Sequence, residues 1–101
     1  MKSYPSEDLA RIACLRQLTE NLHIANLYFG DNDDCQDIFG ASIAENFHST
    51  GAWFVWHSGT FIVSDKESDI LEWALEFAGQ PADICTYQKG AKWYAEIQDW
   101  T

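Results

Sequence analysis

The residues most able to do chemistry lie in one short stretch, GDNDDCQD at residues 30–37, which holds four carboxylates and a thiol. Such a stretch can bind a divalent cation, activate a cysteine, or form the acidic first turn of a helix. An EF-hand calcium loop requires glycine at its sixth position and glutamate at its twelfth. Counted from Asp31, these positions hold Gln36 and Ser42. The calcium-loop pattern therefore fails, and we expect no metal and no other cofactor.

Cys35 is the candidate nucleophile within this stretch. A helix N-terminus lowers the pKa of a cysteine, but the carboxylates Asp33, Asp34 and Asp37 disfavour a second negative charge. Cys35 also begins an apolar series that continues every fourth residue, which favours burial. No nucleophile elbow, phosphate-binding glycine loop or His/Cys zinc pair is present. We therefore expect that the protein is not an enzyme. The alternative is a small enzyme or metal-binding domain that uses Cys35 or the carboxylates of residues 31–37.

Helix capping explains the residue types of the stretch most simply. Asp31 suits the loop after Gly30, and Asp33 or Asp34 can accept hydrogen bonds from the first N–H groups of a following helix. Capping does not explain how many carboxylates there are. Several of them are therefore expected to face solvent whatever the function.

The charge of the chain bounds the kind of partner. The net charge is −10, and residues 17–88 contain twelve Asp or Glu and one base, Lys66. Such a field repels phosphate backbones and anionic lipid and attracts basic partners. We therefore expect no direct nucleic-acid binding and no membrane association.

Periodicity predicts the elements that must position these residues. Helices are predicted at 6–29, 34–48 and 65–78, although 24–29 could instead form a strand. Strands are predicted at 52–56 and 60–64, and a second hairpin at 85–97 turns at Lys89-Gly90. The predicted fold is a single α+β domain over residues 1–101 in the order α-α-β-β-α-β-β, with helices packed on one small antiparallel sheet.

The faces of these elements indicate what each one presents. In the helix at 65–78 an apolar side is predicted to face the core, and a carboxylate ridge is predicted to face solvent. The apolar side is Ile70, Trp73, Ala74 and Phe77, and the ridge is Asp65, Asp69, Glu72 and Glu76. In the last hairpin one face is predicted to carry Cys85, Tyr87, Trp93, Ala95 and Ile97.

Five tryptophans are many for 101 residues, because a core of this size is unlikely to enclose them all. We expect Trp73 and Trp93 in the core and Trp53 and Trp56 on opposite faces of their strand. Trp100 lies near the chain end. An exposed tryptophan beside carboxylates would match the anchor and polar rim of a protein interface.

Cysteine count and hydropathy bear on location. Cys14, Cys35 and Cys85 form neither a disulfide framework nor a zinc ribbon, which favours a reducing compartment. The longest apolar run, residues 52–56, is too short to cross a bilayer. We expect a soluble, cytoplasmic protein.

Together these features favour an inhibitor that blocks a basic, nucleic-acid-binding surface of a partner protein. In size and acidity the chain resembles anti-CRISPR proteins, anti-restriction DNA mimics and nuclease immunity proteins. The expected partner-binding residues are Asp31, Asp33, Asp34, Asp37, Asp65, Asp69, Glu72, Glu76, Trp53 and Trp56. A homodimer that pairs through the apolar hairpin at 52–63 is a further alternative.

Overall fold

The computed structural model describes residues 2–22, 24–48, 51–80 and 83–97, without the side chains of Phe47 and His48. These residues form four helices and two antiparallel sheets, which confirms the α+β class. The helices are α1 (Glu7–Thr19), α2 (Asn32–Phe39), α3 (Ala41–His48) and α4 (Glu67–Phe77). The strands are β1 (Leu27–Asp31), β2 (Trp53–His57), β3 (Thr60–Ser64), β4 (Ile84–Lys89) and β5 (Lys92–Ile97).

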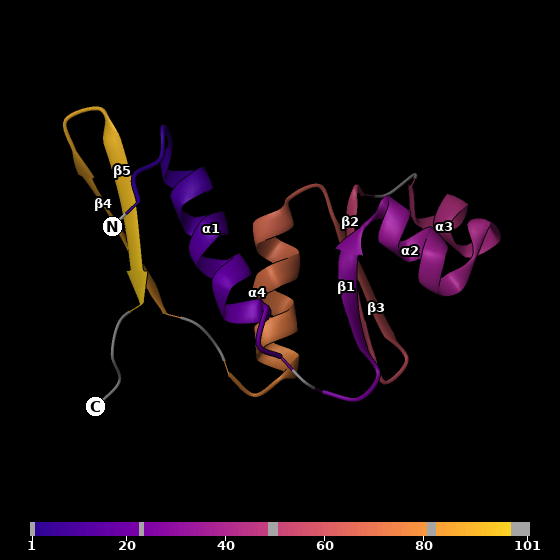
Figure 1. Cartoon of the computed structure of the whole chain (residues 1–101). Helices are drawn as coiled ribbons and strands as arrows, with labels where there is room; N and C mark the ends of the chain where they lie inside the picture. The colour runs from indigo at the N-terminus through magenta and orange to yellow at the C-terminus, as the bar shows by residue number, and fades with distance from the viewer. Residues whose placement is uncertain (1, 23, 49–50, 81–82, 98–101) are drawn as a thin grey trace.

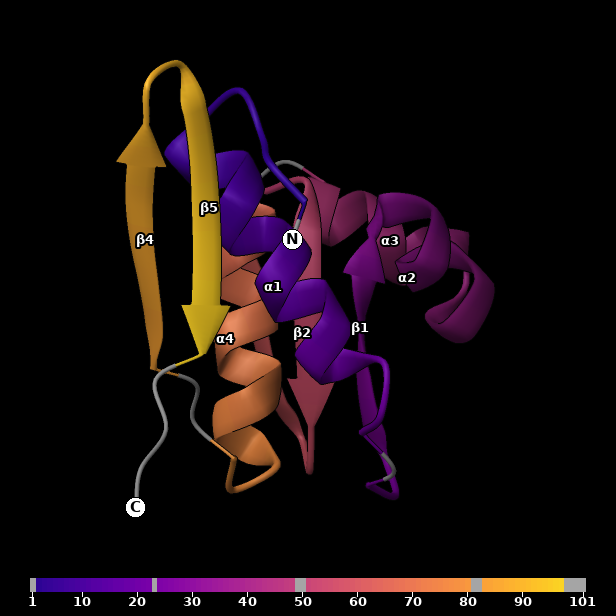
Figure 2. The ribbon, with the colours of Figure 1, turned by 60° about the vertical axis from the view of Figure 1, so that its left-hand side comes forward.

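The elements form four layers along the long axis of the molecule (Figure 1). The hairpin β4–β5 lies at one end, followed by α1 with α4, then the sheet β1-β2-β3, and then α2 with α3. The turned view shows the hairpin beside α1 and away from the three-stranded sheet (Figure 2). The principal extents, 46 × 30 × 17 Å, follow from this stacking. One sheet was predicted, and the structure has two.

Helix α1 begins as predicted and ends earlier. The Ser6 side chain accepts a hydrogen bond from the N–H of Leu9, which caps the helix. The prediction of helix to residue 29 is wrong, since α1 ends at Thr19 and the left-handed Asn26 (φ 63°) precedes β1. The chain gains a full antiparallel ladder with β2 here, which offsets the lost helical turns. The alternative of a strand near 24–29 is the one observed, at Leu27–Asp31.

The predicted helix at 34–48 is two helices, because Gly40 interrupts it. Gly40 caps the end of α2 with φ 93°, a conformation that favours glycine. The break changes which side of α3 faces the core. Ala44 is buried, whereas Ile43, which continues the apolar series of α2 in sequence, is exposed.

The three-stranded sheet is covered on both faces. Val55 packs with Ile70 and Ala74 of α4 on one face, and Phe54 packs with Cys35 and Ala44 of α2 and α3 on the other. Trp53 and Trp56 lie on opposite faces, as predicted. Intrachain packing therefore accounts for the apolar character of both strands of the 52–63 hairpin.

The β4–β5 hairpin packs on α1, and its predicted face is wrong. The register pairs Tyr87 with Tyr94 and Thr86 with Ala95. Tyr87 therefore does not share a face with Ala95, because a one-residue change in pairing exchanges the faces of a strand. The two tyrosine rings stack with centroids 5.2 Å apart.

Candidate functional site

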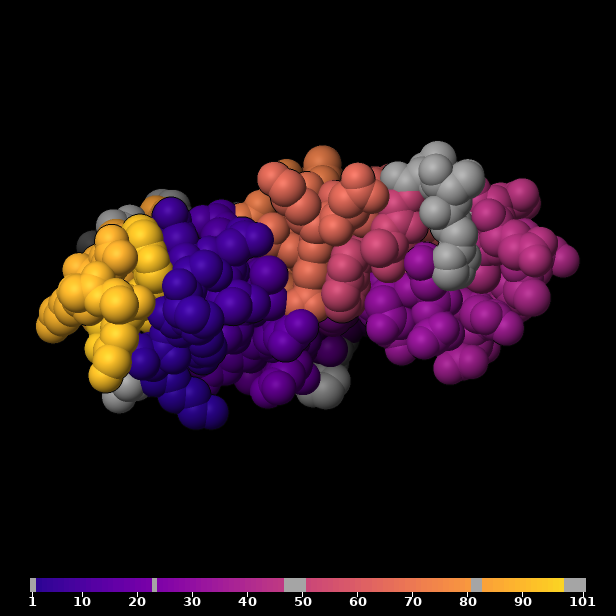
Figure 3. All heavy atoms as spheres, turned by 90° about the horizontal axis from the view of Figure 1, so that it is seen from above, coloured from indigo at the N-terminus to yellow at the C-terminus, as the bar shows by residue number. Residues whose placement is uncertain are grey.

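Several predicted partner-binding residues that are far apart in the sequence lie together at one end of the three-stranded sheet. In the register, Asp31 at the end of β1 pairs with Trp53 at the start of β2, and Trp53 pairs with Ser64 at the end of β3. Helix α2 starts directly after Asp31, and α4 starts shortly after Ser64. Figure 3 looks onto this end of the molecule. We call it the acidic end; its carboxylates are Asp31, Asp33, Asp34, Asp65 and Glu67, together with Asp37, which lies one turn after Asp33 on α2.

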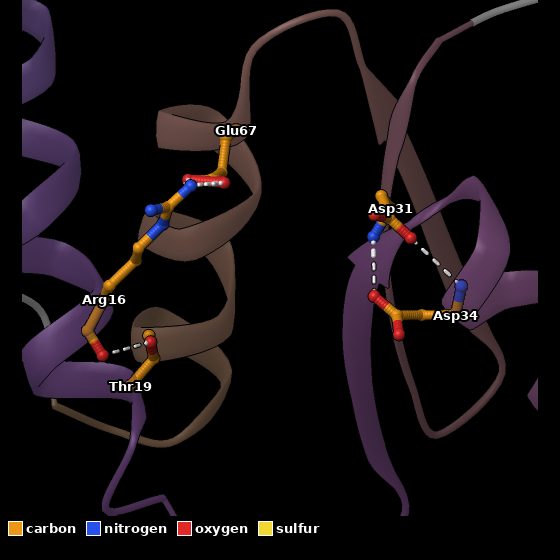
Figure 4. Close-up of polar contacts among 5 residues, drawn as sticks. All are labelled: Arg16, Thr19, Asp31, Asp34 and Glu67. Carbon is orange, nitrogen blue, oxygen red and sulfur yellow. Dashed lines mark hydrogen bonds and ion pairs between the residues drawn. The ribbon is translucent and has the colours of Figure 1, made fainter.

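The acidic stretch that opens α2 forms a capping box. The N–H of Asp34 donates to the Asp31 carboxylate at 3.1 Å, and the N–H of Asp31 donates to the Asp34 carboxylate at 3.0 Å (Figure 4). Gly30 allows this approach, because a Cβ there would lie 2.8 Å from Cβ of Asp34. Capping by Asp33 or Asp34 was predicted, and the residues that cap are Asp31 with Asp34. Asp33 and Asp37 stay exposed, so their charge is available to a partner.

Two grooves meet at Trp53. One has a volume of about 390 Å³ and is lined by Asp31, Asn32, Asp33, Ala52 and Trp53. The other, of about 470 Å³, lies between α1, β1 and α4. Its lining residues are Arg16, Thr19, Glu20, Phe29, Gly30, Asp34, Trp53, Glu67, Ile70 and Leu71. Trp53 is half-buried between hollows that carry carboxylates, which is the arrangement of an anchor with a polar rim.

The second groove also contains an internal ion pair. The Arg16 guanidinium donates to both carboxylate oxygens of Glu67, at 2.6 and 2.7 Å (Figure 4). Glu67 is only 8% exposed, whereas the Arg16 side chain is 62% exposed. This hydrogen bond raises the pKa of Arg16 above its already high usual value. Glu67 is thus neutralised within the chain and adds little charge for a partner.

No family model, curated protein or solved structure matches the chain. Its function has to be argued from the geometry of its own residues.

The structure brings together some of the predicted partner-binding residues and separates others. Asp65 is exposed at the acidic end, and Asp69 accepts a hydrogen bond from Ser64 at 2.9 Å. Glu72 forms an ion pair with Arg11 of α1, so the carboxylate ridge of α4 is not continuous. Trp56 lies away from Trp53, on the face of the sheet toward α2.

The surroundings of Trp56 are those of a packed ring. Its ring centroid lies 5.6 Å from that of Tyr28 and 5.9 Å from that of Phe39. These contacts hold α2 against the sheet, so Trp56 contributes packing here.

Trp73 is the functional candidate that sequence analysis missed. It was predicted in the core, but its side chain is 40% exposed on α4. Helix α4 is covered by α1 on one side and by the sheet on another, and Trp73 lies outside both contacts. The available signal was position: Trp73 falls one turn after Asp69 and just before Glu76, at helical spacings of four and three.

Cys35 lies in the core of the α2 side and is 1% exposed, between Ala44 and Phe54. Burial raises the pKa of its thiol, which lowers the thiolate fraction at neutral pH. A thiol in this position is poorly placed to attack a substrate.

Alkylation should report the burial of Cys35. With iodoacetamide at pH 8, we expect Cys35 of the folded protein to react at least about tenfold more slowly than the exposed Cys85. Peptide mass spectrometry over time measures both rates, and repeating the reaction in urea provides the control, in which the two rates should converge. Equal rates in the folded protein would show that Cys35 is accessible.

The described ranges contain no group of three or more His, Cys, Asp or Glu placed to hold a metal ion. Within the same residues, no helix is both long and apolar enough to cross a membrane.

Proposed function

We propose that this chain is a small acidic inhibitor that binds a basic, nucleic-acid-binding surface of a partner protein and blocks it. In this proposal it acts in the manner of anti-CRISPR proteins, anti-restriction DNA mimics and nuclease immunity proteins. The observation that supports it most directly is the acidic end, where the half-buried Trp53 lies between two grooves lined by carboxylates of residues 31–34.

The charge of the acidic end suits this role. Residues 27–48 contain five Asp or Glu and no Lys or Arg. Among the residues that the structure describes, the exposed Asp33 and Asp37 have no ion-pair partner. An uncompensated negative surface accelerates the approach of a basic partner and disfavours acidic ones. Trp53 can then supply the desolvated contact that slows dissociation.

Blocking requires no catalytic group, which agrees with the surroundings of the thiol. Cys35 is enclosed between α2, α3 and β2 and has a raised pKa. A binder that works by covering a surface needs only shape and charge. We therefore propose binding rather than catalysis.

Neutralising the exposed carboxylates of the acidic end should weaken binding. The test variant carries Asp33→Asn, Asp37→Asn and Asp65→Asn. We expect its affinity for the partner to fall about tenfold, since three exposed ion pairs at about 0.5 kcal/mol each are lost. The partner is first captured from host lysate in 50 mM salt and purified. Its affinity is then measured by calorimetry, and the displacement of a labelled nucleic acid from it by anisotropy.

The control variant removes the same charge elsewhere. It carries Glu7→Gln, Asp8→Asn and Glu96→Gln, which are exposed on α1 and β5. Its affinity should change less than about threefold, because distant exposed charges are screened. If both variants lost the same affinity, the negative charge would act nonspecifically, and the acidic end would have no special role in binding. A partner that remains bound to nucleic acid when saturated with this chain would contradict the blocking role.

A further inference from the structure

The exposed side of α4 presents an aromatic ring where a helix of this kind normally presents polar groups. Ile70 and Ala74 on the sheet side of α4 are fully buried, whereas Trp73 is 40% exposed. A large apolar side chain left in water on a well-packed helix is a candidate contact for a partner.

The Trp73 ring is supported from one side. Its centroid lies 5.8 Å from that of Phe77, and the Phe77 centroid lies 5.4 Å from that of His57 on β2. The three rings form a row from the exposed surface of α4 to the end of β2. A ring held in this way loses little conformational entropy when a partner binds to its open face.

Two carboxylates flank the ring along the helix. Asp69 lies four residues before Trp73 and Glu76 three residues after it, and both side chains are exposed. Residues at these spacings are neighbours on one helix face. The Asp69 carboxylate is oriented by the hydroxyl of Ser64, which donates to it at 2.9 Å. Within the described residues neither Asp69 nor Glu76 has an ion-pair partner.

Two other carboxylates of α4 show what such groups bind. Glu67 and Glu72 are each paired with an arginine of α1, Arg16 and Arg11 respectively. These are the two arginines of the sequence, so the chain has none left for the outer face of α4. A guanidinium at Asp69 or Glu76 would have to come from another molecule.

We infer that Asp69, Trp73 and Glu76, here called the α4 shelf, bind an arginine side chain of the basic partner. The inference rests on the proposed function and specifies one of its contacts. The guanidinium plane stacks on the open face of Trp73, and its N–H groups donate to a flanking carboxylate. Arginine fits better than lysine, because it is planar, weakly hydrated and able to donate in a fork.

Charge argues against a second copy of this chain on the shelf. Self-association through α4 would bring the unpaired Asp69 and Glu76 of one copy close to those of the other, which is unfavourable. A basic segment removes this repulsion and turns it into attraction. The shelf therefore favours a different, positively charged partner.

Capped hexa-arginine and hexa-lysine peptides test the shelf, because they carry equal charge and differ in the group that can stack. By calorimetry in 50 mM salt, we expect the wild type to bind hexa-arginine more tightly than hexa-lysine. Trp73→Ala should weaken hexa-arginine binding about fivefold and change hexa-lysine binding less than twofold. Trp73→Phe should retain most of the arginine preference. Ile43→Ala, which truncates an exposed apolar residue on α3, should change neither affinity.

The outcomes separate the shelf from the proposed function. If the wild type binds both peptides and Trp73→Ala binds hexa-arginine as tightly as the wild type does, the inference about the α4 shelf is wrong. The proposal of an acidic binder is then unaffected. If the wild type binds neither peptide at this salt, the proposed function fails as well. If sedimentation shows a wild-type dimer that Trp73→Ala converts to monomer, a second copy covers the shelf and the inference is overturned. Circular dichroism confirms that each variant is folded.

Discussion

Replacing Phe54 with alanine should lower the free energy of unfolding by about 3–5 kcal/mol. Phe54, the second residue of β2, is 2% exposed, and its ring centroid lies 5.6 Å from that of Phe61 and 6.0 Å from that of Phe39. Removing the ring takes away its own burial and leaves a cavity between the sheet and α2. Because α2 and α3 hold to the sheet mainly through this aromatic cluster, the acidic end should lose its order first.

Urea unfolding followed by circular dichroism measures the loss. Phe54→Leu provides the matched control, since it retains most of the apolar volume, and it should cost about 1–1.5 kcal/mol. A loss below about 1 kcal/mol for Phe54→Ala would mean that the cluster does not carry the attachment of α2. Domains of this kind have total stabilities of about 5–15 kcal/mol, so this loss is a large fraction of the total and should clearly lower the melting temperature.

Replacing Gly51 with alanine should cost about 1–3 kcal/mol through crowding. Gly51 is buried just before β2, and a Cβ there would lie 2.8 Å from both N and O of Ser64. These are backbone atoms of β3, so relief requires one strand to move away from the other. The displacement would reach Trp53 and the start of α4, which adjoin this point.

Gly59→Ala is a suitable comparison, because a Cβ there meets no atom within 4 Å and the cost comes only from its φ of 85°. Gly51→Ala should be the more destabilising of the two and should also weaken partner binding, whereas Gly59→Ala should leave binding unchanged. Thermal melts and the calorimetric assay measure both properties. Wild-type stability in Gly51→Ala would show that β3 can move aside without loss.

The sequence predicted the elements best where local signals agreed. The start of α1 near residue 6, the end of α4 near residue 78 and the hairpin of β2 with β3 depend on local signals, and each lies where it was predicted. The end of α1 could not be placed, because the helical spacing of apolar residues up to Phe29 competes with a ladder to β2, twenty-four residues further along the chain. Long-range pairing decides such a case, and local periodicity carries no information about it.

The candidate site was predictable in part. The negative charge of residues 31–37 and the opposite faces of Trp53 and Trp56 follow from composition and strand alternation. The exposure of Trp73 follows only in part. Its spacing from Asp69 and Glu76 places it beside the carboxylates, but the edge of the buried side depends on where α1 and the sheet contact α4. The ion pair that neutralises Glu72 with Arg11 likewise depends on how α1 packs against α4. Apolar spacing predicts that α4 has an inner side and gives only its approximate extent.

The layered stacking separates charge along the 46 Å axis. Residues 27–48, toward one extreme, contain five Asp or Glu and no Lys or Arg, whereas the β4–β5 hairpin at the other extreme contains Lys89 and Lys92 with one carboxylate, Glu96. The molecule is therefore an electric dipole as well as an anion. A dipole experiences a torque in the field of a cationic surface, so the protein should rotate as it approaches and arrive with α2 and α3 leading.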